Sequence, residues 1–188
     1  DWHVRASPTR CLTFGMNCKA DYQAIDLQLN GFSGSNFVLQ TPEQAVEVTL
    51  KVPGRQGIYN ALAAAAVADA LGISAITIRE GLAAVKPAPG RGGVAVLSPD
   101  ASLIDDTYNA NPVAVRAAID VLASESGRRR LVLGAMLELG PDEEKLHAEL
   151  GAYAREAGLD ELWAVGSEAA PAAVAFGEGA LCFTDTSE

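Results

Sequence analysis

Cysteine and histidine are scarce in this sequence of 188 residues. An odd number of cysteines without C-x-x-C spacing argues against a disulfide framework. The histidines lie far apart, whereas a zinc site needs three or four clustered nitrogen or sulfur ligands. The residues concerned are Cys11, Cys18, Cys182, His3 and His147. The sequence therefore predicts neither a disulfide scaffold nor a zinc module.

Positive charge and long apolar runs are also lacking. The 14 lysines and arginines are outnumbered by 24 acidic residues, and the formal net charge is −10. The one basic cluster, Arg128 to Arg130, precedes an apolar run and is typical of a solvated strand entrance, so nucleic acid and anionic membranes are poor partners. Apolar segments break before about 18 residues and no signal peptide opens the chain, so we expect a cytoplasmic monomer without membrane insertion.

Apolar residues are nevertheless plentiful enough for a real core, at 49% hydrophobic against 20% charged. Such a chain has room for one domain or two small ones. Residues 20–52 alternate in the runs AIDLQLNGF, NFVLQT and AVEVTLKV, with turn residues between the first two. Period-two alternation of this kind predicts a small antiparallel sheet with one wet face.

Helical texture follows the predicted sheet. The alanine-rich run IYNALAAAAVADALG ends at Gly72, as expected for a left-handed helix cap, and a second helix is predicted from Ala75 to Val85. The segment KPAPGRGG then combines prolines and glycines as a linker does. We therefore expect two domains, residues 1–87 and 88–188.

Beyond the linker, apolar strands and helical patterns alternate, which favours an α/β fold with a mainly parallel sheet covered by helices on both faces. The predicted strands are GVAVLS, SLIDD, RLVLGA, ELWAVG and ALCFT, with helices from Pro112, Pro141 and Glu168. The stretch IDDTYNANP comes at the end of one strand, where such sheets bind ligands. Its polar residues also allow a plain helix start, with Asn111 as the N-cap and Pro112 at the first helical position.

Taken together, the motifs resemble those of the Mur ligases. They are GRQGIYNALAAAAVADALG, PGR, IDDTYNANP, VLGAMLELG and HAELG, in the family's order and spacing. The likeness runs from Phe14 to Gly166 and is strong from Gly54 onward. It implies the end of a central ATPase domain, with a small antiparallel sheet and helices, followed by a Rossmann-like and incomplete C-terminal domain.

The resemblance also implies a reaction, an ATP-dependent amide ligation of peptidoglycan precursor synthesis that requires Mg²⁺. In the branch of the family that the motifs match best, ATP phosphorylates the terminal carboxylate of UDP-N-acetylmuramoyl-tripeptide. The amine of D-alanyl-D-alanine then attacks the acyl phosphate and gives an amide, ADP and phosphate. The implied partners are thus ATP, the UDP-linked tripeptide and D-alanyl-D-alanine.

Three residues match functional positions of the family, and two neighbours in one loop are further candidates. Arg91 is implied to reach the nucleotide phosphates, and Asp106 to hold the ribose side and the hinge. Asn60 is implied to contact the adenine edge. Tyr108 and Asn109 lie next to Asp106 in the same loop and are candidates for lining the nucleotide pocket. From the residues alone, Arg91 could equally be a linker arginine, Asn60 an exposed helix residue, and Tyr108 a ring packed under the helix.

Two further residues have less specific assignments. Asp105 is expected to bind nearby backbone amides. His147 matches a recurrent family histidine, but its place in a helix is as compatible with a structural role as with a substrate-facing one.

The sequence also departs from the family. It contains no G-x-x-x-x-G-K-[ST] phosphate loop and neither the magnesium ligands nor the modified lysine of the central domain. Gln56 and Gly57 stand where histidine and asparagine are usual, and Ala135 replaces an aspartate. We therefore expect a ligase fragment that is inactive alone. The alternatives are a related ligase for another stem peptide or for folate, and a nucleotide-binding or interaction module without activity.

Overall fold

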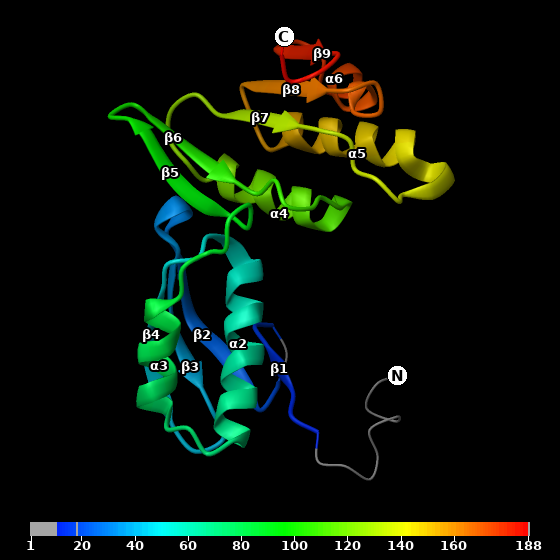
Figure 1. The fold of residues 1–188 in the computed structure, drawn as a ribbon. Helices are drawn as coiled ribbons and strands as arrows, with labels where there is room; N and C mark the ends of the chain where they lie inside the picture. Colours follow the sequence, from blue (N-terminus) through cyan, green and yellow to red (C-terminus); the bar gives the residue numbers. More distant parts are fainter. Residues whose placement is uncertain (1–10, 18, 188) are drawn as a thin grey trace. The chain divides into compact units, whose positions relative to one another are not determined.

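The computed structural model describes residues 11–17 and 19–187 and divides into two compact units, residues 1–86 and 87–188 (Figure 1). His3 and Cys18 lie outside the described residues. Within the described residues, no helix is both long and apolar enough to span a bilayer.

The first unit is a four-stranded sheet in the order β1-β2-β3-β4, packed against two helices. The strands are β1 (Phe14–Gly15), β2 (Tyr22–Leu29), β3 (Ser35–Gln40) and β4 (Ala45–Leu50). The predicted antiparallel pairing is confirmed for β2, β3 and β4, whereas the short β1 pairs parallel with β2 and was not anticipated. Alternate residues of β3 face the core, as the period-two pattern requires.

The helices of the first unit are α2 (Gly54–Ala70) and α3 (Ala75–Ala84). Alanine and leucine favour α2, and its apolar residues Ile58 and Leu62 are fully buried against the sheet. Helix α2 is followed by Gly72, whose φ of 79° is that of the predicted left-handed cap. The hydroxyl of Ser74 then starts α3 by accepting a hydrogen bond from the Thr77 amide at 3.2 Å.

The second unit begins with an antiparallel hairpin of β5 (Gly93–Ser98) and β6 (Ala101–Asp105). Its apolar side chains are strongly exposed, Val96 at 76% and Leu97 at 65%. The chain continues through α4 (Pro112–Ala123), β7 (Arg130–Leu133), α5 (Glu143–Glu156), β8 (Glu161–Val165), α6 (Ala170–Phe176) and β9 (Ala180–Phe183). Strands β7, β8 and β9 form a parallel sheet in that order, which confirms the predicted α/β alternation for these strands. Strands β5 and β6 form a separate antiparallel sheet and do not join it.

Only one face of the β7–β9 sheet is covered within the described residues. Leu133, Leu162 and Ala164 are buried in one cluster with residues of α4, α5 and α6. On the opposite face, Val132 is 58% and Leu181 is 51% exposed. The expectation of helices on both faces is therefore wrong here. Consecutive parallel strands joined by right-handed crossovers place their helices on the same side.

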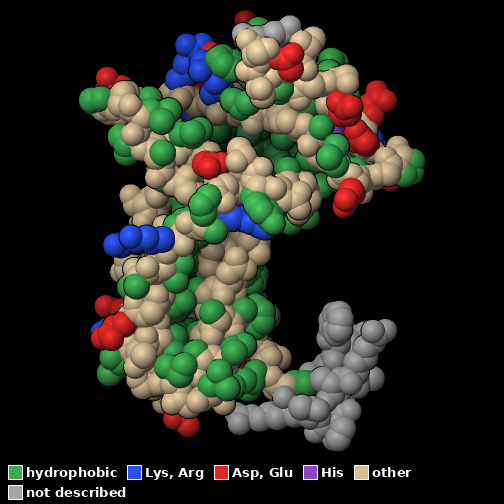
Figure 2. Space-filling view, in the orientation of Figure 1, with side chains coloured by type: hydrophobic (Ala, Val, Ile, Leu, Met, Phe, Trp, Pro, Cys, Tyr) green, Lys and Arg blue, Asp and Glu red, His purple; other side chains and the backbone are tan. Residues whose placement is uncertain are grey.

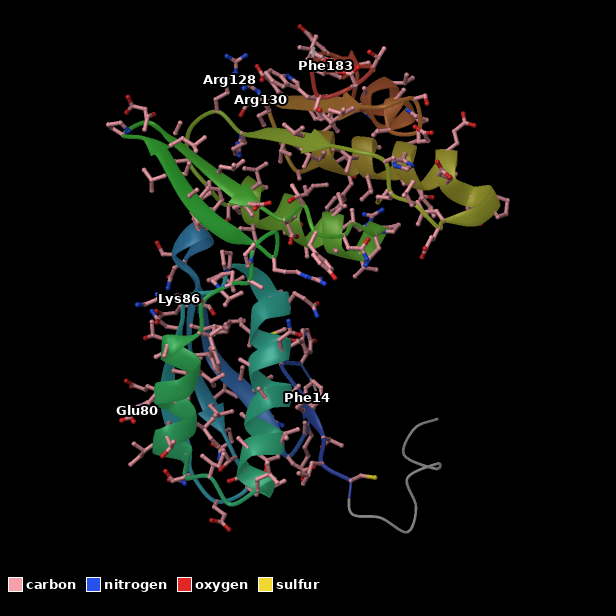
Figure 3. The ribbon with its side chains drawn as sticks, viewed as in Figure 1. Phe14, Glu80, Lys86, Arg128, Arg130 and Phe183 are labelled. Atoms are coloured by element: carbon pink, nitrogen blue, oxygen red, sulfur yellow. The ribbon has the colours of Figure 1, made fainter. Side chains whose placement is uncertain are left out.

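The open face carries a cation–aromatic cluster. The Arg130 guanidinium lies 3.8 Å from the centroid of the Trp163 ring, and the centroids of the Trp163 and Phe183 rings are 5.5 Å apart. Figure 3 labels Arg130 at the start of β7 and Phe183 on β9. The carboxylate of Glu161 accepts a hydrogen bond from Arg130 Nε and also pairs with Arg128. The basic cluster thus begins β7, as predicted, and it is paired with an acidic residue of β8.

Helices α5 and α6 cross at a glycine. A Cβ atom built on Gly151 would lie 1.9 Å from the backbone oxygen of Ala172. No side chain fits in that space, so the glycine permits the close approach on which the packing of the two helices depends.

Candidate functional site

Two loops of the second unit meet where the predicted polar cluster lies. The linker residues before β5 contact the loop that follows β6, because the Tyr108 amide donates to the Gly90 carbonyl at 3.0 Å and the Gly92 amide donates to the Asp105 carbonyl at 2.9 Å. Gly90 has a φ of 71°, and a Cβ there would lie 2.9 Å from the Tyr108 nitrogen. The glycines of PGRGG therefore serve a close backbone approach as well as a turn.

Asp105 binds the loop itself, as predicted. Its Oδ1 accepts from the Thr107 hydroxyl at 2.6 Å and from the Thr107 amide at 3.3 Å. These hydrogen bonds hold the pKa of the Asp105 carboxyl below its usual value, the side-chain bond having the largest effect. Asp105 thus stays ionised and fixes the loop.

The pKa of Asp106 is shifted in the opposite direction. Neighbouring atoms remove part of the water from its carboxylate, which raises the pKa of Asp106, while the charge of Arg91 and the Gly92 amide act in the opposite direction. The residue as a whole is exposed. An exposed carboxylate has several lone pairs, so beside the Gly92 amide it can still accept from hydroxyl groups of a ligand.

Arg91 and Tyr108 form a stack at the edge of this loop. The guanidinium carbon of Arg91 lies 3.9 Å from the centroid of the Tyr108 ring. Tyr108 is 68% exposed, so the alternative that its ring packs under the helix is wrong. Both a permanent positive charge and an aromatic face are thereby presented to solvent beside Asp106.

The two asparagines of the loop differ in what they contact. Asn111 is the N-cap of α4, because its Oδ1 accepts from the Ala114 amide at 2.9 Å and Pro112 follows at the first position. Asn109 is exposed. The structure thus assigns the plain capping role to one asparagine and leaves the amide of the other accessible.

Asn60 lies in the first unit, on α2, and its side chain is exposed. Four of the five candidate residues are therefore brought together by the second unit, and the fifth is on a separate body. The neighbouring Gly57 is buried, and a Cβ there would lie 2.9 Å from Cγ1 of Val52. The space that a side chain at position 57 would need is thus filled by Val52.

The sequence does not predict the buried environment of His147. His147 is fully buried, and its ring nitrogens contact the Met136 amide and the Glu143 carbonyl. A lone histidine in an amphipathic helix gives no sign of such contacts, since they depend on how the loop after β7 folds back. The histidine is therefore structural in its contacts and does not face solvent.

Metal-binding groups do not gather anywhere in the described residues. No cluster of three or more His, Cys, Asp or Glu side chains there could hold a metal ion. The described residues thus do not by themselves fit a Mg²⁺ site.

Comparison with known proteins relates both units to a single family. The pattern described as Mur ligase middle domain matches residues 3–68, and that described as Mur ligase, glutamate ligase domain matches residues 91–186. The UDP-N-acetylmuramoyl-tripeptide–D-alanyl-D-alanine ligase of Escherichia coli (strain K12) is 41% identical over 180 residues, which are 95% of this chain and 40% of that relative. This chain thus spans about two fifths of the relative's length.

Solved structures give the same relationship. A crystal structure of MurF from Acinetobacter baumannii superposes with a TM-score of 0.83 at 37% identity, covering 92% of this chain and 37% of that one. The MurF ligase of Thermotoga maritima in complex with ADP superposes with a TM-score of 0.80 at 26% identity, covering 98% of this chain and 42% of that one.

Proposed function

Since this chain belongs to the Mur ligase family, we propose that it carries one side of the nucleotide site of an ATP-dependent ligase that joins D-alanyl-D-alanine to UDP-N-acetylmuramoyl-tripeptide. Residues 1–87 are assigned to the central domain and residues 88–188 to the C-terminal domain. The observation that carries the proposal is the convergence of Arg91, Asp106 and Tyr108 on one loop pair of a chain 41% identical to such a ligase.

The contacts of the loop suit the ribose and phosphates of a nucleotide. The accessible Asp106 carboxylate can accept from both ribose hydroxyls, while the Asp105 carboxylate is occupied by Thr107. The Arg91 guanidinium is a fork of donors that remains charged and matches phosphate oxygens. The exposed Tyr108 ring, the Asn109 amide and the Asn60 amide are assigned to the base and its surroundings.

The reaction that we propose needs positioning and charge neutralisation more than acid–base chemistry. The γ-phosphoryl group of ATP passes to the tripeptide carboxylate, and ADP leaves. The amine of the dipeptide then attacks the acyl carbon, phosphate leaves, and the nitrogen loses a proton. Arg91 would stabilise the negative charge on the transferred phosphoryl oxygens, which is the largest contribution that this chain's own residues can make.

The isolated chain is expected to bind ATP only weakly. Its sequence has no phosphate loop, and its candidate residues lie on two units. A few exposed hydrogen bonds and one charge-assisted contact amount to roughly 4 kcal/mol, which corresponds to about millimolar dissociation. Titration of ATP followed by NMR should shift the amides of Asp106, Tyr108 and Asn109. The analogue 2′,3′-dideoxy-ATP should shift the Asp106 amide much less. A dissociation constant below about 10 µM would instead favour a dedicated nucleotide-binding module.

The ligase reaction itself is best tested in a chimera. This chain replaces the matching segment of the E. coli relative, and phosphate release is measured with ATP, UDP-linked peptides and candidate acceptors. We expect activity with D-alanyl-D-alanine and the UDP-linked tripeptide, and a loss of about a hundredfold in kcat for Arg91→Ala. Preference for another peptide or for folate in the panel would assign the chain to a different ligase. If kcat of the Arg91→Ala chimera lies within threefold of that of the parent chimera, Arg91 has no role at the phosphates and is a linker residue.

A further inference from the structure

The loop after β7, residues 134–139, is held in an unfavourable backbone conformation. Glu138 has a φ of 64°, in the left-handed region that residues with a Cβ rarely adopt. Conformations of this kind persist only where the surroundings impose them. The loop starts at the carboxyl end of β7, the edge where parallel sheets bind their ligands.

Two contacts fix this loop from below. The Met136 side chain is fully buried in the core of the second unit. The Met136 amide donates a hydrogen bond to Nε2 of His147 at 3.0 Å. Next to this anchored residue, Leu137 is 71% exposed, so the loop is fixed at its base and open at its tip.

The second nitrogen of His147 determines the chemical form of the ring. Nδ1 lies 2.9 Å from the carbonyl oxygen of Glu143, one turn earlier in α5. A carbonyl can only accept, so Nδ1 carries the hydrogen, and Nε2 must keep its lone pair for the Met136 amide. Only the neutral Nδ1–H tautomer satisfies both contacts. A hydrogen on Nε2 would face another donor.

We infer that His147 is a positioning residue that ties the loop 134–139 to the first turn of α5 through this one tautomer. The His147 ring is completely buried. The acidic side chains at the start of α5 lie on the surface instead (Figure 2). The ring therefore acts on a ligand only through the loop that it holds. That the loop serves the ligase reaction rests on the proposed function, while the clamp does not.

The clamp is tested on the 188-residue chain by NMR. A long-range ¹H–¹⁵N correlation should show His147 as the Nδ1–H tautomer, the rarer form for histidine in water. His147→Phe fills a similar volume without an acceptor and should speed hydrogen exchange of the Met136 amide about tenfold. His147→Gln can place Oε1 near the position of Nε2 and should keep the exchange within about threefold of the parent. The Leu162 amide, in the core of β8, should exchange equally in all three proteins.

The positioning role is tested in the E. coli chimera, where His147→Phe should lower kcat/KM about tenfold and His147→Gln should restore most of it. The NMR measurements need no nucleotide, so their failure and the failure of the proposed function are distinguishable. If His147→Phe does not fold, the tautomer measured in the parent protein still tests whether the clamp exists. An Nε2–H tautomer or an imidazolium, or equal Met136 exchange in the Phe and Gln variants, would overturn the clamp. Unchanged kcat/KM in His147→Phe would overturn the positioning role.

Discussion

Arg91 lies over the face of Tyr108, with its guanidinium carbon 3.9 Å from the ring centroid. A stack of this kind at an exposed site is worth about 0.5–1 kcal/mol. That is small enough for a ligand with stronger acceptors to draw the arginine away. The stack is therefore compatible with an arginine that leaves Tyr108 when it binds a ligand.

The stack can be detected without any ligand. Protons held over an aromatic face are shielded, so the Arg91 side-chain resonances should lie upfield of those of a free arginine. They should remain upfield in Tyr108→Phe and return to ordinary positions in Tyr108→Ala. Resonances that do not differ between the parent and Tyr108→Ala would show that the arginine is elsewhere in solution.

The pKa of Asp105 should lie below that of an ordinary aspartate, and the pKa of Asp106 should lie above it. The Thr107 hydrogen bonds lower the pKa of Asp105, and desolvation raises the pKa of Asp106. Carboxyl ¹³C NMR should therefore show Asp105 losing its proton at lower pH than Asp106. Removing the positive charge in Arg91→Gln should raise the pKa of Asp106 further. The reverse order of titration would contradict the geometry of the loop.

The same shifts predict opposite effects on stability at pH 7. A carboxyl with a lowered folded-state pKa stabilises the fold above its unfolded pKa, about 3.9, and this contribution is lost as the pH falls. A carboxyl with a raised pKa is unfavourable once ionised. Asp105→Asn should thus lower the free energy of unfolding measured in urea, and Asp106→Asn should leave it unchanged or raise it. Equal losses in both variants would contradict this prediction.

Gly151 and Gly81 should respond oppositely to alanine. A Cβ at Gly151 would meet the Ala172 backbone, so Gly151→Ala should destabilise the second unit by about 2 kcal/mol or more. Gly81 lies within α3, and a Cβ placed there would meet open space among the described residues, so Gly81→Ala should stabilise the first unit by about 0.5–1 kcal/mol. Urea unfolding of both variants checks this, and a neutral Gly151→Ala would mean that the helices can move apart.

Glu161 should make the second unit sensitive to acid. The hydrogen bond from Arg130 is the main cause that lowers the pKa of Glu161, so its stabilising effect is present above about pH 4.3 and is lost below it. Glu161→Gln should be less stable at pH 7 and should lose less stability on acidification than the parent. The exposed Glu149 is the matched control, because its pair with Lys145 is a surface one. Identical pH slopes for the parent and Glu161→Gln would rule out this role.

Most of the architecture could be predicted because it depends on local patterns in the sequence. Periodicity predicts the strands around β3. A single capping residue predicts the left-handed cap at Gly72 after α2 and the start of α4 at Asn111. The loop that holds Asp106 could be recognised for the same reason, because the sequence has more polar residues there than one N-cap requires.

What could not be predicted depends on contacts between distant segments. The stack of Arg91 on Tyr108 requires the Gly90 backbone to meet the loop after β6, and no spacing reveals that. The contacts of His147 require the loop after β7 to fold back on α5. The uncovered face of the β7–β9 sheet could not be predicted, because the alternation of strands and helices gives their order along the chain. It does not show on which side of the sheet each helix lies.

The exposed β5–β6 hairpin should be the least stable part of the second unit. A two-stranded ribbon with solvated apolar side chains is marginal on its own, and such segments are the first to open in native-state hydrogen exchange. Its base is the pair formed by Gly93 and Asp105, between which the linker and the Asp106 loop emerge. Fraying that reaches this pair would release both loops together, so Arg91 and Asp106 should lose their positions in one step.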